Sequence, residues 1–134
     1  MPTLTTMTPE LTLLLWTVIL TFIIIMIPAG MGIKENGGPA QAGPRDNLPE
    51  PSVLRKRATR LAVNMKENLV LFAVLVLVAH AAGVSNDMTI LGAQIFFYTR
   101  IVHAVVYLAG WPHVRPLIWL AGVIGMGMIA AQLL

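Results

Sequence analysis

The chain contains no cysteine, and only 11% of its 134 residues are charged. The absence of cysteine excludes disulfides, a thiol nucleophile and thiolate metal sites, so any thiol chemistry needs a sulfur that arrives with a ligand. The scarcity of charge excludes an ordinary soluble domain, in which about 25% of residues are charged. Hydrophobic residues make up 57% of the chain. We therefore expect a single membrane domain covering residues 1–134.

Four apolar segments are each long enough to cross a bilayer, which takes about 20 helical residues. They cover residues 11–33, 60–82, 89–110 and 114–134. The connections after the second and third segments are short, so these neighbours must run up and down. The sequence has no alternation of period two that would indicate strands. It therefore predicts an all-α bundle of four transmembrane helices.

The one long connection, residues 34–59, is rich in glycine and proline, which predicts an irregular loop. Basic residues are concentrated in or beside it: Lys34, Arg45, Arg55, Lys56, Arg57 and Arg60. Because cytoplasmic connections collect Lys and Arg, we expect the first and third connections in the cytoplasm and both termini outside. The expected position of the basic residues at the cytoplasmic surface explains the net charge of +3, so no nucleic-acid partner is needed to account for it.

Polar residues inside two of the apolar segments are the strongest functional signal. Arg100, His103 and Tyr107 share one helical face of the third segment. Asn64 and Glu67 lie one turn apart in the second segment. A charge at such depth costs roughly 3 kcal/mol, so it is rarely present without a partner or a role. At about 1.5 Å per residue, Glu67 and His103 come level roughly 10 Å deep. We expect Glu67 to pair with Arg100.

An Arg–Glu pair alone would do no more than hold two helices in register. The surplus of positive charge indicates an additional role. Arg60, Arg100 and Arg115 are expected at one level, with Glu67 as the single nearby carboxylate. Such a pocket, opening toward the cytoplasm, predicts an anionic ligand. No metal site is expected, because His103 and Glu67 lack further ligands.

These residues lie in segments that resemble the MAPEG family, the membrane-associated proteins of eicosanoid and glutathione metabolism. Residues 57–68, with the step Asn64-x-x-Glu67, look like the second-helix motif of the family. Gly92-Ala93, the Arg-x-x-His-x-x-x-Tyr step and the following Arg115 look like its third helix and exit loop. The likeness covers nearly the whole chain and is closer to the bacterial branch of the family.

The resemblance implies a homotrimer of four-helix protomers, with glutathione as cofactor between neighbouring subunits near the cytoplasmic side. The positions that match the family's glutathione contacts are Arg60, Asn64, Glu67, Arg100, His103 and Tyr107. Arg115 is similar to the arginine that is assigned to stabilising the glutathione thiolate in several members. A guanidinium stays charged and favours the anionic form of a thiol. The two carboxylates of glutathione also suit surplus arginine.

We therefore expect a bacterial inner-membrane protein that acts on lipophilic substrates as a glutathione-dependent transferase or peroxidase. The alternative is a non-catalytic membrane protein that binds a lipid or a small anion in an intersubunit pocket. A small transporter fits less well, because polar residues continue poorly toward the outer face, where only His80 and Asp87 lie.

Overall fold

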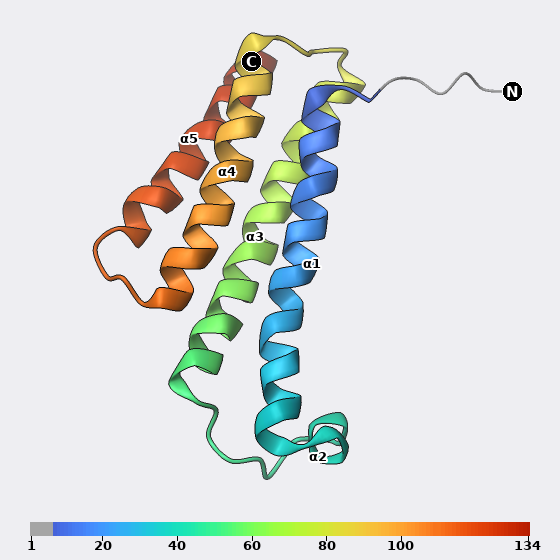
Figure 1. Cartoon of the computed structure of the whole chain (residues 1–134). Coiled ribbons are helices and arrows are strands. Elements are labelled where there is room, and N and C mark those ends of the chain that lie inside the picture. Colours follow the sequence, from blue (N-terminus) through green and yellow to red (C-terminus); the bar gives the residue numbers. More distant parts are fainter. Residues whose placement is uncertain (1–6) are drawn as a thin grey trace, which may run out of the picture.

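The computed structural model describes residues 7–134, and every regular element within that range is a helix. Its four long helices are each long and apolar enough to cross a membrane: α1 (Pro9–Asn36), α3 (Val53–Ala81), α4 (Asp87–Ala109) and α5 (Arg115–Leu133). They run up and down side by side, with α5 at one edge and α1 at the other (Figure 1). The all-α architecture with four spanning helices is therefore confirmed. The amino terminus, predicted outside, belongs to residues 1–6 and lies outside the described range.

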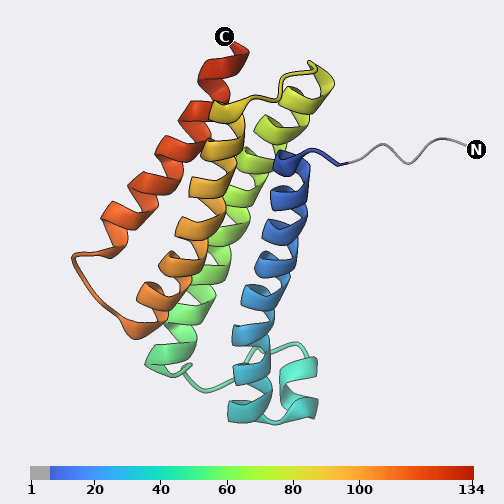
Figure 2. The ribbon, with the colours of Figure 1, turned by 45° about the horizontal axis from the view of Figure 1, so that its top comes forward.

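The connection predicted as an irregular loop over residues 34–59 is shorter and partly helical. Helix α1 continues past Pro28 to Asn36, and the short α2 (Gly38–Ala42) follows at the same end of the bundle (Figure 2). Helix α3 begins seven residues earlier than Arg60, because the Ser52 hydroxyl caps it and accepts a hydrogen bond from the backbone nitrogen of Arg55 at 3.2 Å. The predicted start followed the apolar run, which begins later than the cap.

Helices α4 and α5 share the most extensive contact in the bundle. Glycines make this possible, because a Cβ added at Gly92 would lie 2.5 Å from the backbone oxygen of Gly125. The reverse addition at Gly125 would lie 2.6 Å from the oxygen of Gly92. Small residues let membrane helices approach until their backbones touch, which gains dispersion energy that lipid does not supply.

The buried interior has two apolar clusters separated along the helices by a polar layer. The cluster nearer the α3–α4 connection contains the stacked rings of Phe72 and Phe96, whose centroids are 4.1 Å apart. The cluster nearer the α4–α5 connection is built around Leu61 and Met65. Between them in sequence lies Asn68, which is buried and donates to the backbone oxygen of Asn64 at 2.8 Å. The polar layer is therefore enclosed by apolar packing above and below.

A buried carboxylate ties α1 to the α3–α4 connection at the other end of the bundle. Glu10 is 3% exposed and accepts hydrogen bonds from the hydroxyls of Ser85, at 2.9 Å, and Thr89. Thr89 also completes the capping box with which Asn86 begins α4. One residue thus links the start of α1 to the start of α4.

The edges of the bundle leave one side of α3 open. Helix α1 packs chiefly on α3 and α5 chiefly on α4, and across residues 7–134 α1 and α5 do not pack together. The open side of α3 exposes a stripe in which Glu67 lies among apolar side chains, with Val70 and Val74 each more than half exposed. We call this the open face of α3. It separates the candidate site from the groove between α1 and α3.

The close approach of α4 and α5 makes a direct prediction. Gly92→Ala should destabilise the protein by about 1–3 kcal/mol, because the added methyl group overlaps the backbone of α5. Gly127→Ala is the matched control, since a Cβ there would meet nothing within 4 Å. Thermal unfolding of both variants in detergent checks the prediction. Equal melting temperatures for the two would mean that the helices are not in backbone contact.

Candidate functional site

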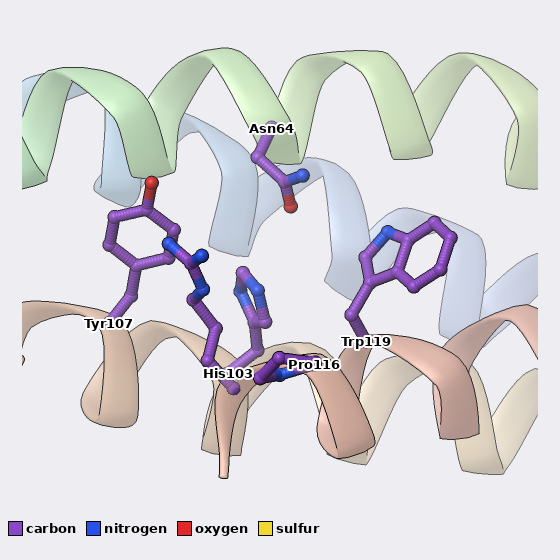
Figure 3. Close-up of a pocket in the computed structure, with 6 residues that line it drawn as sticks. Asn64, His103, Tyr107, Pro116 and Trp119 are labelled. Atoms are coloured by element: carbon purple, nitrogen blue, oxygen red, sulfur yellow. The ribbon is translucent and has the colours of Figure 1, made fainter. Parts of the chain in front are cut away.

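A cavity of about 340 Å³ opens among α3, α4 and the start of α5. Its lining residues are Asn64, His103, Tyr107, Arg115, Pro116 and Trp119. Figure 3 shows Asn64 reaching from α3 toward side chains of α4 and α5, with Tyr107 at one end and Trp119 at the other. Four residues predicted for the site from two distant segments and the exit loop therefore line a single cavity.

A second cavity of about 280 Å³ adjoins the first and shares Tyr107 and Arg115 with it. Its other lining residues are Arg57, Arg60, Val106, Gly110, Trp111 and Pro112. Arg60, also predicted for the site, is thus in the adjoining cavity and not in the first one. We refer to the two cavities together as the double cavity.

Arg115 lies where the two cavities meet. Its guanidinium carbon is 4.9 Å from the centroid of the Tyr107 ring, a cation–π contact. The Tyr107 ring in turn lies 5.5 Å from the ring of His103, which is 2% exposed. The ring of Tyr107 holds the guanidinium of Arg115 in one orientation. Because Arg115 is exposed, its N–H donors remain free for a ligand.

Arg100 does not line the double cavity but lies behind it. This side chain is 1% exposed, and its Nη1 donates to Oδ1 of Asn64 at 3.0 Å. The bond fixes the Asn64 amide with its oxygen toward Arg100, so its nitrogen remains as a donor for the cavity that Asn64 lines. Nε and Nη2 of Arg100 are buried without a partner in residues 7–134. Such buried donors are costly, which favours an anion or an ordered water beside them.

The expected ion pair between Glu67 and Arg100 is wrong. Glu67 is exposed on the open face of α3 and forms no ion pair with any residue in the described range. The reason is rotational: Asn68 is buried against the bundle, and the preceding residue of a helix points about 100° away from it. Glu67 lies at the expected depth along the bundle axis, but its side chain does not point toward α4. Asn64 is the partner of Arg100 instead.

Arg57 is a member of the double cavity that reasoning from the sequence missed. Its guanidinium lies against Gly110 at the end of α4, where an added Cβ would be 2.7 Å from the guanidinium carbon. Gly110 has φ of 75° and closes α4 in the left-handed conformation. The partial negative charge of that helix end favours a cation there. The sequence does contain a signal for Arg57, because Arg57, Arg60 and Asn64 follow the i, i+3, i+7 spacing of one helical face.

The double cavity is therefore strongly cationic. Three arginines line it, Arg57, Arg60 and Arg115, and none of its lining residues is acidic. The charge of Arg100 lies behind it, attached to Asn64. Convergent guanidinium groups bind carboxylates and phosphates through paired hydrogen bonds. The arrangement suits an anionic ligand and would also stabilise a negative charge that develops on it.

The choice of partner for Arg100 is tested by two double-mutant cycles. Asn64→Leu and Arg100→Met should couple by about 1.5 kcal/mol or more, because they remove the two ends of a charged hydrogen bond. Glu67→Leu and Arg100→Met should be additive within about 0.5 kcal/mol. Unfolding free energies in mixed micelles supply both cycles. Strong coupling in the Glu67 cycle with none in the Asn64 cycle would reinstate the ion pair.

The comparisons with known proteins place nearly the whole chain in a family. The sequence profile described as the MAPEG family matches residues 7–134. No curated protein and no solved structure matches the chain. The matched range contains all four helices that are fit to span a membrane as well as the whole double cavity. The chain is an integral membrane protein that belongs to the MAPEG family.

Proposed function

We propose that the protein is a glutathione-dependent transferase or peroxidase that acts on lipophilic substrates. The observation that supports this best is the double cavity, which has three arginines and no acidic residue in its lining. Glutathione is a small peptide with two carboxylates, one ammonium group and one thiol. It would supply the sulfur nucleophile that a chain without cysteine cannot provide.

The lining residues fit this ligand. Arg57 and Arg60 suit its carboxylates, and the free amide nitrogen of Asn64, held in place by Arg100, adds a neutral donor. Arg115 is the residue that would stabilise the thiolate, because it is positioned by Tyr107 and its guanidinium attracts the anionic form of a thiol. The proposed cofactor-binding set remains Arg60, Asn64, Glu67, Arg100, His103 and Tyr107, and Glu67 would join it through assembly of the subunits.

The lipophilic substrate has an approach from the membrane side. An apolar cavity of about 400 Å³ lies between α3 and α5 and is lined by Val70, Leu71, Val74, Leu75, Val123, Met126, Gly127 and Ala130. Asn64 and Trp119, which line the first cavity, belong to the same two helices. A substrate lodged there would bring its reactive end toward Arg115 while its apolar part stays out of water.

Assembly as a homotrimer is part of this proposal. Glu67 is exposed among apolar side chains on the open face of α3, where facing lipid would cost roughly 3 kcal/mol. A neighbouring subunit removes that cost if it covers the open face, and the apolar cavity, which shares Val70 and Val74 with that face, would then lie at the boundary between subunits and open to lipid there. Glu67 would then be available to the ammonium group of a ligand held between subunits. We place the basic connections in the cytoplasm of a bacterial inner membrane and both termini outside.

The same cationic lining supports a second function, binding of a lipid headgroup or a small anion without catalysis. Both functions need the arginines, but only the enzyme needs a thiolate. The state of the glutathione sulfur therefore separates them.

Adding glutathione to the detergent-purified protein should produce the ultraviolet absorbance of a thiolate. Arg115→Ala should abolish this signal and lower the turnover of an electrophilic substrate by about 10²–10³, the usual effect of removing one stabilising donor. Lys34→Ala is the control, because Lys34 is a basic residue at the end of α1 that lines neither cavity. Binding of an anion without any thiolate signal at millimolar glutathione would favour the non-catalytic function.

The absence of cysteine allows a direct test of assembly. A single cysteine at Val70, on the open face of α3, should form disulfides between subunits under mild oxidation. A cysteine at Phe22, an exposed residue of α1, should not. Electrophoresis without reductant and native mass measurement of the detergent-solubilised protein are the readouts. Monomeric particles, or cross-linking at Phe22 alone, would show that the open face of α3 is not the interface.

A further inference from the structure

A further cavity lies between α1 and α3, on the other side of the open face of α3 from the double cavity. Its volume is about 310 Å³. It is lined by Ile25, Pro28, Ala29, Gln41, Arg45, Arg55, Thr59, Ala62, Val63 and Lys66. None of these residues lines the double cavity. We call it the α1–α3 groove.

The lining of the α1–α3 groove changes character along the helices. Arg45 and Arg55 lie at its outer end, beside α2. Ala62 follows Arg55 by seven residues, about 10 Å deeper along α3. Ile25 of α1 lines the same apolar part of the groove. Lys66 lies one turn deeper still, and its long side chain can extend back toward the charged mouth. A basic mouth above an apolar floor matches the two parts of a phospholipid.

The charges at this groove are not equally available. Arg55 pairs with Glu35 at 3.2 Å. Lys56, nearby but outside the groove, pairs with Glu50 at 2.6 Å and lowers the pKa of that carboxyl group by donating a hydrogen bond. Arg45 and Lys66 have no acidic partner in the described residues. Two cations of the groove therefore remain for an anion.

The mouth of the groove is held in a defined shape. Gln41 packs so closely on α1 that a Cβ at Gly32 would lie 2.6 Å from its amide nitrogen. Its amide oxygen accepts from Asn36 at 3.1 Å. Arg45 has φ of 67°, an unfavourable conformation for a residue with a side chain, and its Nε donates to the backbone oxygen of Gln41 at 2.7 Å. The remaining donors of Arg45 stay free at the mouth.

We propose that the α1–α3 groove binds an anionic phospholipid, with the phosphate between Arg45 and Lys66 and an acyl chain along Ile25, Ala62 and Val63. The groove lies at the end of the bundle that carries the basic connection, where the helices leave the membrane. Free phosphate would gain nothing from the apolar floor, whereas a lipid uses both parts.

Short-chain phosphatidylglycerol and phosphatidylcholine titrated onto the full chain in neutral detergent test this site. The wild type should bind phosphatidylglycerol more tightly, and the double variant Arg45→Gln, Lys66→Gln should bind it roughly tenfold more weakly. Lys34→Gln removes a charge at the same end of the bundle without touching the groove and should bind like the wild type. Equal affinity for the two lipids, or equal binding by the double variant, would overturn the proposal.

Two further measurements separate a lipid from a free anion and a binding defect from misfolding. Glycerol phosphate should fail to displace phosphatidylglycerol at equal concentration, and full displacement would mean that the groove recognises phosphate alone. Val63→Trp keeps every charge but fills the apolar floor, so it should also weaken lipid binding. Circular dichroism and the glutathione response of each variant show whether the rest of the molecule is intact. Unchanged lipid binding by Val63→Trp would argue against an acyl chain in the groove.

Discussion

A buried guanidinium is the constraint on which the rest of this structure depends. Arg100 is almost fully enclosed within a helix that is apolar enough to span a membrane, where lipid offers it no hydrogen bonds. The bundle supplies one partner, Asn64, and places the ring of Phe96 within 5.8 Å of the guanidinium. This charge can be tolerated only if α3, α4 and α5 keep their relative positions. The helix arrangement that holds Arg100 therefore also shapes the cavity that Asn64 lines.

The glycine contact between α4 and α5 serves the same end. Gly92 and Gly125 bring the two backbones together, and Gly122 approaches Arg100 closely enough that an added Cβ would lie 3.9 Å from its Nε. A side chain at Gly92 or Gly125 would push α5 away and expose the guanidinium. Because Arg115 begins α5, the same displacement would move it relative to Tyr107. Packing far from the cavity thus sets the geometry of its exposed arginine.

Much of this arrangement could be predicted from the sequence, because the bilayer fixes the length of a spanning helix and helical periodicity fixes which residues share a face. Those two rules brought Asn64, His103, Tyr107 and Arg115 to one cavity. The partner of Arg100 could not be found in this way, because depth gives the level of Glu67 but not its direction, which depends on how α3 is rotated in the bundle. Glu10 was missed for a related reason. A lone acidic residue at a helix start looks like an ordinary cap, and its partners Ser85 and Thr89 are distant in sequence.

The rotation of α3 also explains why two different kinds of site lie on one helix. Residues that face α4 and α5 meet the ends of those helices, where Arg115 and Gly110 leave room for polar ligands beside fixed cations. Residues that face α1 meet a helix with no charge between Leu11 and Ile33, so charge on that side comes from the segment that joins α1 to α3, with Arg45, and from α3 itself, with Arg55 and Lys66. Lys66 and Glu67 are neighbours in the chain, yet Lys66 lines the α1–α3 groove while Glu67 lines neither that groove nor the double cavity. The open face of α3 between the two sites holds a carboxylate, Glu67, that has no ion-pair partner in the described residues, and this exposed charge is the observation behind the proposed homotrimer.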